Sequence, residues 1–366
     1  MYRIGNVPRQ PRDTELFQHM YTRKGFFGAY ANLYKTQSPG EPVRWDPRLG
    51  PASIDVAAAR PPDLDDPDGQ PLPLLTNGDI SVSISRRRQP MRFCWRNVDA
   101  DELYFIHRGR ARFETEFGLL DAQPGDFVYL PRNVVYRLVP QSDDTLHLIL
   151  ETQSMLETAD GYHRAHGETS MGLDLSLIGV PEPGTTSALD QAEHEVRLKV
   201  DGELYSMFYD YDPVGVTAGW AGDPIVFKLS GWEVPAARLP STPPTAAIFM
   251  TDGSEAVVTV HTPPPGGLVA SRGGGPPAHT NDYDELWFLH APVGAPVSGG
   301  VGQLRWDPQG LTQAGARRRG STNGQTQRPT DVPVLNVNVD VRKRLRLTPA
   351  AEALVREQAV AAGASA

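Results

Sequence analysis

Two seven-residue segments that lie far apart in the chain are almost identical. Residues 101–107 read DELYFIH and residues 284–290 read DELWFLH. In both segments two acids precede a run of aromatic and aliphatic residues, which is typical of a buried strand. The chain has 366 residues, more than one hydrophobic core usually supports, so the repeat predicts a duplicated fold.

Short apolar segments bounded by Gly, Pro or Asp surround both copies of the repeat. They occur from residue 79 to 152, as in DISVSIS, and again from residue 226 to 345, as in EAVVTVHT and VLNVNVDV. The 35 Gly and 34 Pro of the chain supply the turns. Strands at this spacing are typical of antiparallel barrels or sandwiches. We therefore expect an all-β fold with a first barrel at 79–152 and a second barrel at 226–345.

The rest of the chain is less periodic. Residues 1–78 are Pro-rich and predict an arm with a few strands, and residues 153–225 predict a segment that connects and covers the barrels. Residues 346–366 predict a short C-terminal helix, because Thr348 can cap its start and Pro349 suits its first position.

Composition and charge argue against several classes of partner. The formal net charge is −9 and no basic tract occurs, so nucleic acid is not an expected partner. No run of about 18 apolar residues predicts a membrane span. The first residues lack the apolar core of a signal peptide, and the only cysteine, Cys94, cannot form an internal disulfide. We expect a cytoplasmic protein.

The segment HTNDYDELWFLH, residues 279–290, is dense in potential metal ligands. Alternate side chains of an extended strand share a face, which groups His279, Asn281, Tyr283, Glu285 and Trp287. His279 and Glu285 could then converge on one cation, whereas His290 points the other way. The alternative is that these residues form only the polar edge of a strand. An imidazole and a carboxylate on the inner wall of a barrel suit an iron site whose third ligand comes from a neighbouring strand.

A turn that could lead to this third ligand occurs twice. The first copy is Gly125-x5-Pro131-x-Asn133-x2-Tyr136, and the second reads Gly302-x5-Pro308-x-Gly310-x2-Gln313. The combination of His-x-(His/Asn)-x3-Glu with Gly-x5-Pro-x-Gly-x2-His is the paired motif of cupins. The chain therefore resembles a bicupin, a protein with two cupin barrels.

Within the cupins, the chain most resembles homogentisate 1,2-dioxygenases. These enzymes carry His-x-Asn-x3-Glu, as at His279, Asn281 and Glu285, preceded by a Pro-Pro pair like Pro276-Pro277. The segments DELYFIHRG, TEFG and PGDFVYLPRNVVYRL also resemble the ligand-free first cupin of that family.

The resemblance implies one metal site, in the second barrel. Its expected ligands are His279, Glu285 and Gln313, although Gln313 could instead bond the backbone at the barrel mouth. Asn281 and Tyr283 would contact substrate, or would hydrogen-bond within the wall as buried polar groups must. His261 at the rim is a further candidate to replace the missing imidazole.

The first barrel is expected to hold no metal. At the fixed spacing of the motif, Arg96 and Val98 stand where the first ligands would be and Tyr136 stands at the third, so only Glu102 remains. We expect Glu102 to be structural. His107 and His290 occupy equivalent places in both copies of the repeat, which predicts a shared structural role for them.

The implied function is that of an Fe(II)-dependent, ring-cleaving dioxygenase that acts with O2 on a hydroxylated aromatic acid or related phenolic, in a homo-oligomer. Three departures predict a substrate other than homogentisate. Gln313 stands where the family has a histidine, RLPSTPPTAAIF lacks the family's acid-base histidine, and Pro277 replaces a tyrosine. Two alternatives are a metal-dependent enzyme with non-oxidative chemistry, such as an isomerase or a lyase, and a non-catalytic binding bicupin.

Overall fold

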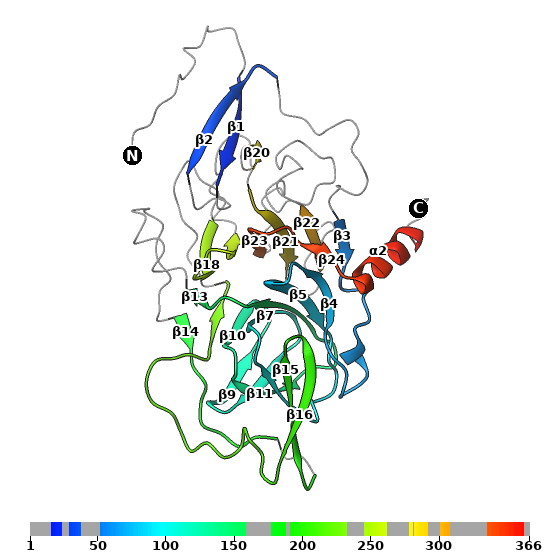
Figure 1. Cartoon of the computed structure of the whole chain (residues 1–366), viewed down its shortest axis with the longest axis vertical. Coiled ribbons are helices and arrows are strands. Elements are labelled where there is room, and N and C mark those ends of the chain that lie inside the picture. The colour runs from blue at the N-terminus through cyan, green and yellow to red at the C-terminus, as the bar shows by residue number, and fades with distance from the viewer. Residues whose placement is uncertain are drawn as a thin grey trace.

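The computed structural model describes residues 16–23, 29–37, 52–158, 177–187, 191–232, 245–261, 278–280, 282–291, 301–307 and 335–361. Strands in these residues form four sheets, and α2 (Pro349–Ala361) forms a helix near the C-terminus (Figure 1). The backbone N–H of Ala351 donates to Thr348 Oγ1 at 3.1 Å, so Thr348 caps the helix as the sequence predicts. The predicted all-β class with a short C-terminal helix is confirmed. None of the helices in these ranges is long and apolar enough to span a membrane.

The first barrel, called barrel 1, is built from two sheets. One has the order β14 (Ile178–Gly179), β17 (Phe227–Ser230), β10 (Asp126–Leu130), β7 (Asp101–Arg108), β12 (Leu146–Thr152), β5 (Ile80–Ser85), β4 (Leu72–Thr76) and β24 (Arg346–Leu347). The other has the order β16 (Glu203–Tyr209), β15 (His194–Val200), β6 (Cys94–Asn97), β11 (Val135–Pro140), β8 (Ala111–Thr115) and β9 (Gly118–Ala122). A 3-10 turn, η2 (Pro62–Leu64), precedes β4.

The second barrel, called barrel 2, is described in part. Its larger sheet has the order β13 (Leu156–Thr158), β18 (Thr245–Thr251), β19 (Ala256–His261), β23 (Leu335–Val341), β21 (Asp284–His290), β22 (Gln303–Asp307) and β3 (Ala52–Asp55). The smaller sheet has the order β2 (Tyr30–Lys35), β1 (Phe17–Thr22) and β20 (Ala278–Thr280).

The two barrels repeat one arrangement of strands. β7 and β21 carry the repeated sequence, and each lies between equivalent neighbours: β10 and β12 in barrel 1, β22 and β23 in barrel 2. The loop glycines are equivalent as well. Gly125 N–H donates to the Ile106 carbonyl and Gly302 N–H to the Leu289 carbonyl, and both glycines have positive φ, at 95° and 74°. The duplication predicted from the repeat is therefore present in three dimensions.

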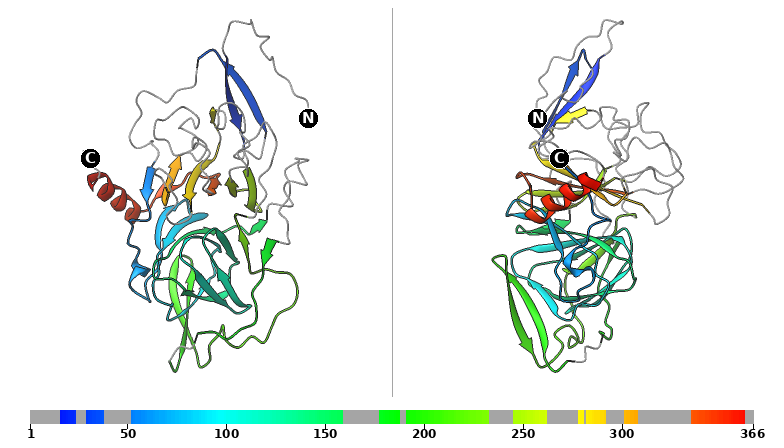
Figure 2. Two further views of the ribbon diagram at one scale, coloured as in Figure 1. Left: turned by 180° about the vertical axis from the view of Figure 1, so that it is seen from behind. Right: turned by 90° about the vertical axis from the view of Figure 1, so that its right-hand side faces the viewer.

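Strands that flank each barrel in the sequence belong to the sheets of the other barrel. β3 precedes barrel 1 but pairs with β22, whereas β17 precedes β18 but pairs with β10. β13 follows barrel 1 and pairs with β18, and β24 follows barrel 2 and pairs with β4. Two hairpins follow the same rule. The hairpin β15–β16 precedes barrel 2 in the sequence but pairs through β15, in parallel, with β6 of barrel 1, and the hairpin β1–β2 precedes barrel 1 but pairs through β1, in parallel, with β20 of barrel 2. The two barrels are thus interlocked and the hairpins project from opposite ends (Figures 1 and 2).

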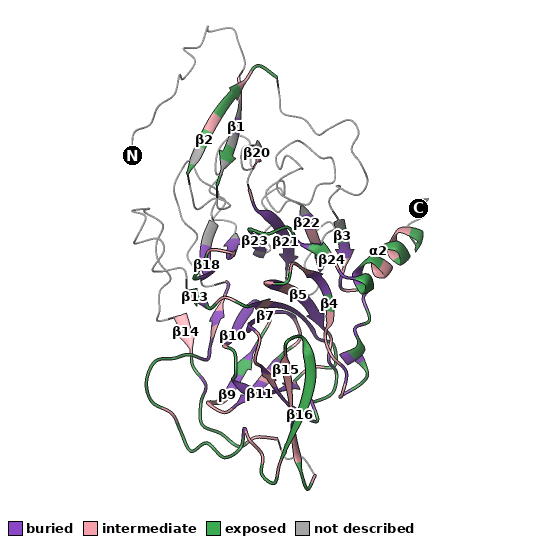
Figure 3. Ribbon diagram, viewed as in Figure 1, coloured by how far each residue is buried: buried purple, intermediate pink, exposed green. Residues whose placement is uncertain are grey.

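A hydrophobic core joins the barrels where β7 and β21 face each other. Phe105 and Phe288 pack there with ring centroids 6.0 Å apart, within a larger buried cluster (Figure 3). At its edge the Nδ1 atoms of His107 and His290 lie 2.9 Å apart, so one ring donates and the other accepts. Burial lowers the pKa of His107 to about 3 and that of His290 to about 4, which keeps both rings neutral. The predicted shared structural role of these histidines is confirmed.

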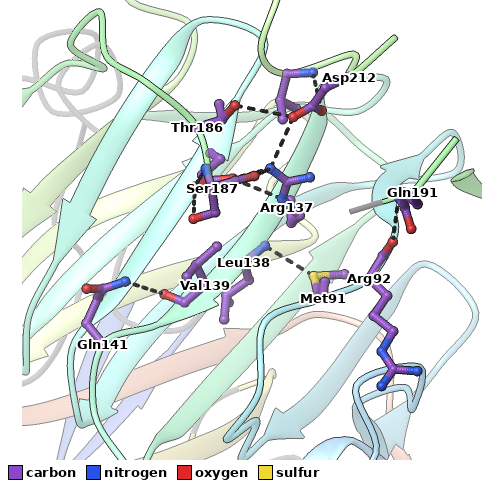
Figure 4. Close-up of polar contacts among 12 residues, drawn as sticks. Met91, Arg92, Arg137, Leu138, Val139, Gln141, Thr186, Ser187, Gln191 and Asp212 are labelled. Atoms are coloured by element: carbon purple, nitrogen blue, oxygen red, sulfur yellow. Dashed lines mark hydrogen bonds and ion pairs between the residues drawn. The ribbon is translucent and has the colours of Figure 1, made fainter. Parts of the chain in front are cut away.

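Part of the connecting segment packs against the outside of barrel 1 through a buried ion pair. The Arg137 guanidinium donates to Glu114 Oε2 at 2.6 and 2.9 Å, and neither side chain is exposed. The same guanidinium donates to the Ser187 carbonyl and to Asp212 Oδ2 (Figure 4). Because a buried charge must be paired, these bonds fix the connecting segment to β11.

Candidate functional site

The candidate site is organised by β21, whose alternate side chains face opposite ways. Leu286 and Phe288 belong to the core between the barrels. Glu285 and Trp287 therefore point in the opposite direction, into barrel 2. Glu285 is buried, and Trp287 is half-buried.

Glu285 has an acidic residue at the paired position of each neighbouring strand. Asp340 of β23, also buried, is its direct partner across the strands, and Asp307 of β22 holds the partner position on the other side. Directly paired residues place their Cβ atoms roughly 5 Å apart. Two buried carboxylates this close favour a cation between them.

The wall next to these acids is polar. Asn338 and Arg305 are the cross-strand partners of Trp287, and Thr259 is the partner of Asn338 on β19. Asn338 is only 8% exposed, and its Oδ1 has no hydrogen-bond partner among the described residues. A buried acceptor of this kind suits a ligand that carries a hydrogen-bond donor.

The sequence contained a signal for this wall that our prediction of the site did not use. In VLNVNVDV, Val alternates strictly with Asn336, Asn338 and Asp340. Val337, Val339 and Val341 enter the core between the barrels, so Asn338 and Asp340 between them take the opposite face. Alternation of this kind in a strand of a duplicated barrel could have predicted a polar cavity wall.

The segment before Glu285 differs from the continuous strand that was expected. β20 ends at Thr280, and Asp282 and Tyr283 form a bend before β21 begins. The expectation of a single strand through residues 279–287 is therefore wrong, and strict alternation does not carry the predicted shared face through the bend. Tyr283 is buried and its hydroxyl donates to the Ser254 carbonyl at 2.6 Å, a hydrogen bond within the wall.

The remaining predicted ligands lie partly or wholly outside the described residues. The backbone of His279 is placed in β20, opposite Met20 of β1, but its side chain is not described. Asn281, Gln313 and the side chain of His261 also lie outside the described residues. Within the described part of the chain, no group of three His, Cys, Asp or Glu residues is placed to hold a metal. The ligand set of His279, Glu285 and Gln313 thus stays a prediction.

Barrel 1 shows which residues before Glu102 face the barrel interior. They differ from Arg96 and Val98, which the fixed spacing of the motif predicts. Three residues separate Asn97 from Asp101, but only two separate Asn281 from Asp284. In barrel 1 the side chains that reach the inner acids are those of Trp95 and Asn97. We therefore take Trp95 and Asn97 as the counterparts of His279 and Asn281 in the sequence, which makes the loop of barrel 1 one residue longer. The earlier match to Arg96 and Val98 is wrong.

The hydrogen bonds of these residues support the new match. Trp95 Nε1 donates to Glu102 Oε1 at 3.1 Å, and Asn97 Nδ2 donates to Glu151 Oε1 at 2.7 Å. Both side chains are buried, whereas Arg96 between them is half-buried on the other face.

In barrel 1 the residues at the positions of the three expected metal ligands, Trp95, Glu102 and Tyr136, contact one another. The Tyr136 hydroxyl, at the place of the third ligand, donates to Glu102 Oε2 at 3.0 Å, while Trp95 bonds the other oxygen. Tyr104 adds a hydroxyl 2.7 Å from that of Tyr136. Burial, and then the nearby Glu151, raise the pKa of Glu102 to about 7. The predicted structural role of Glu102 is confirmed, because aromatic donors fill the place that a metal would need.

A lysine accompanies the second acid of barrel 1. Glu151 of barrel 1 accepts from Lys199 Nζ at 2.6 Å. The corresponding position of β1, one residue beyond its last pair with β20, is Thr22. By register, therefore, a threonine of β1 is the counterpart of Lys199.

A cavity of about 560 Å³ lies elsewhere, on the outside of barrel 1 next to the connecting segment. Tyr129, Phe227, Leu156 and Ile225 contribute to its mostly apolar lining, which contains no histidine. Its lining includes Glu116, Arg132 and Glu157 but none of the predicted site residues, so the inner wall of barrel 2 remains the candidate site.

Comparisons with known proteins connect this chain to dioxygenases. It is 25% identical over 175 residues to a protein of Saccharolobus solfataricus named as a dioxygenase, covering 47% of this chain and 45% of that protein. It is also 25% identical over 168 residues to homogentisate 1,2-dioxygenase of Nitrobacter hamburgensis, covering 46% and 35%. The matches thus span less than half of either relative. No family model matches the chain.

Solved structures show weaker likeness. A glyoxylate-induced protein of Pseudomonas aeruginosa aligns over 86% of this chain and 96% of its own, with 12% identity and a TM-score of 0.40. A cupin 2 conserved barrel domain protein of Leptotrichia buccalis aligns over 76% and 88%, with 9% identity and a TM-score of 0.31. The sequence relatives, together with the two barrels described above, confirm the resemblance to homogentisate dioxygenases and their cupin fold.

Proposed function

We propose that this homogentisate dioxygenase-like chain is an Fe(II)-dependent, ring-cleaving dioxygenase whose site lies in barrel 2. His279 and Glu285 would hold the metal, and Gln313 would offer its amide oxygen as third ligand. The observation that carries the proposal is the meeting of Trp95, Tyr136 and Glu102 in barrel 1. If the barrels repeat each other here, the corresponding residues of barrel 2 converge in the same way.

The residues around Glu285 fit a divalent cation. The buried pair of Glu285 and Asp340 supplies carboxylate oxygens on this wall. Carboxylate, imidazole and amide oxygen donors suit Fe(II) with positions left open. When bound, Fe(II) would supply sites for a phenolic oxygen and O2 side by side and would pass electrons between them.

The neighbouring wall suits an aromatic substrate with a polar substituent. The half-buried indole of Trp287 offers a flat apolar surface against which a ring can stack. Asn338 Oδ1, which lacks a partner among the described residues, can accept a hydrogen bond from a ring hydroxyl. We therefore assign a hydroxylated aromatic acid or related phenolic as the substrate class. The absence of the family's histidines at Gln313 and in RLPSTPPTAAIF favours a substrate other than homogentisate.

The identity of residue 313 supports a second candidate function. A neutral amide donates less electron density to a metal than imidazole does, which is acceptable when the metal acts only as a Lewis acid. A metal-dependent isomerase or lyase therefore remains the alternative. Turnover that is undiminished under strict anaerobiosis would favour it.

A matched pair of variants tests the site. Protein purified anaerobically is analysed for metal as wild type, Glu285→Gln and Glu102→Gln, which change the equivalent acids of the two barrels. We expect about one iron per chain in wild type and in Glu102→Gln, and at least a tenfold loss of occupancy in Glu285→Gln. Oxygen uptake with a panel of hydroquinone and catechol carboxylates should follow occupancy. A wild type without stoichiometric metal, or equal occupancy in all three proteins, would overturn the proposal.

A further inference from the structure

The hairpin β15–β16 projects from barrel 1 and ends the sheet with an exposed strand. β16 is the last strand of its sheet, and it is exposed along nearly its whole length (Figure 3). Its large apolar side chains are open to solvent on both faces: Leu204 is 51% exposed, Tyr205 55%, Met207 43% and Phe208 61%. Single exposed apolar residues are ordinary, but a contiguous group on an edge strand marks an interaction surface.

The turn of the hairpin determines which backbone groups point outward. Asp201 and Gly202 both have positive φ, at 53° and 78°, as in a two-residue type I′ turn. Such a turn is closed by a hydrogen-bonded pair, here Val200 and Glu203, so every second residue from Glu203 bonds β15. The N–H and C=O groups of Leu204, Ser206 and Phe208 therefore point away from the sheet. In the described part of the chain no residue hydrogen-bonds them.

β16 lacks the features that normally keep an edge strand from pairing. It contains no proline, its register with β15 is regular, and no charged residue lies between Glu203 and Asp210. Natural edges are usually protected by charges, prolines or bulges. An unprotected edge of this length is suited to addition of another strand.

We propose that β16 pairs antiparallel with β16 of a second copy of this chain, about a two-fold axis at Ser206. This register joins the outward-pointing residues: Ser206 meets its own counterpart, and Leu204 meets Phe208 of the second copy. On the other face Tyr205 meets Met207 of the second copy. Each pair brings together apolar or small side chains, and Glu203 faces Tyr209 rather than another acid.

The size of this contact suits a reversible homodimer. Four half-exposed large side chains per copy, with the strand between them, would bury on the order of 1,000 Å² in total, the lower limit for a specific interface. The two six-stranded sheets would become one continuous sheet. The pairing does not depend on the proposed metal site, which lies in the other barrel.

The test compares assembly state in variants of the full chain by sedimentation velocity from 1 to 100 μM. We expect wild type to form dimers of the 40.0 kDa chain. Ser206→Pro removes an outward N–H and places a ring against the partner, so it should weaken dimerisation at least 100-fold. Ser206→Ala, which keeps the N–H but loses the Oγ bond to Glu195, should leave it within about threefold of wild type.

Two further variants keep the test decisive. If Ser206→Pro does not fold, as judged by circular dichroism, Phe208→Lys should dissociate the dimer. Tyr34→Lys on β2, the equivalent edge of the other hairpin, should not. A wild type that is monomeric at 100 μM, an assembly unchanged by Ser206→Pro and Phe208→Lys, or an open-ended assembly that is lost with Tyr34→Lys would each overturn the proposal.

Discussion

Barrel 1 and barrel 2 share a strand frame but differ in what fills it. At equivalent positions Tyr104 becomes Trp287, Val128 becomes Arg305, and Ile149 becomes Asn338. The first of each pair belongs to the buried core of barrel 1, whereas the second lines a polar wall. One copy of the duplication therefore supplies stability through packing, and the other is free to carry polar groups that would weaken a lone barrel.

The equivalent glutamates show the same difference at atomic scale. Glu102 accepts from an indole and a phenol, both fixed by packing, and its raised pKa reflects burial without a cation in direct contact. Glu285 has Asp340 as its cross-strand partner, and barrel 2 replaces the indole position by His279. In barrel 1, aromatic donors thus occupy the positions around the glutamate that the proposed site of barrel 2 gives to metal ligands.

Truncation of the equivalent aromatic residues, Tyr104 and Trp287, should give the largest difference in unfolding free energy between the two barrels. Tyr104→Ala removes a buried ring and a hydroxyl bond, so we expect the free energy of unfolding to fall by about 3–5 kcal/mol. Trp287→Ala truncates a half-buried ring at a cavity wall and should cost about 1 kcal/mol. Urea unfolding followed by circular dichroism measures both. Equal losses would show that barrel 2 is packed as barrel 1 is.

The duplication was predictable because local sequence patterns specify it. Seven matching residues, the glycines that begin the second motif and the period-two alternation around them all identify equivalent strands from sequence alone. The reciprocal pairing of β3 and β17 was not predictable. These strands have four residues each, and their partners lie in the other barrel, so nothing local specifies the pairing.

The inward-facing residues of barrel 1 were missed for a related reason. Since side chains alternate, a loop longer by one residue moves every position before it to the other face. Matching at constant spacing therefore selected Arg96 instead of Trp95. Glu285 could be singled out because it lies inside the repeat, whereas Asp340 and Asn338 come from a strand with no recognised motif.

Acid should destabilise the chain partly through barrel 1, which has the buried His147 at a position where barrel 2 has Asn336. His147 is fully buried, and burial lowers its pKa to about 4, whereas Asn336 holds the equivalent position. Below about pH 6.5 the His147 ring is protonated in the unfolded state but not in the folded state. The contribution of His147 to the free energy of unfolding is therefore fully present above about pH 6.5 and is lost as the pH falls to about 4. The raised pKa of Glu102 changes stability with pH in the opposite direction. Glu102 is present both in wild type and in the His147→Asn variant, so its effect cancels when the two are compared.

His147→Asn should therefore reduce the loss of stability between pH 7 and pH 4.5 by roughly 2–3 kcal/mol. Urea unfolding of wild type and variant at the two pH values gives this difference directly, and any constant cost of the substitution cancels. His107 and His290 remain in both proteins and provide the residual pH dependence. A pH dependence that is the same in both proteins would place the sensitive groups elsewhere.

Making the wall of barrel 2 resemble barrel 1 should have the smallest effect on stability and the opposite sign. Asn338→Ile introduces the residue type found at position 149 and removes an acceptor that has no partner in the described residues. Because an unsatisfied buried polar group costs about 1–3 kcal/mol, we expect a gain of roughly 1 kcal/mol in unfolding free energy. The same change should weaken binding of a hydroxylated aromatic ligand about tenfold, since one hydrogen bond is lost. If instead the variant is destabilised and ligand binding is unchanged, Asn338 belongs to the internal structure of barrel 2, and the difference between the two barrels does not extend to β23.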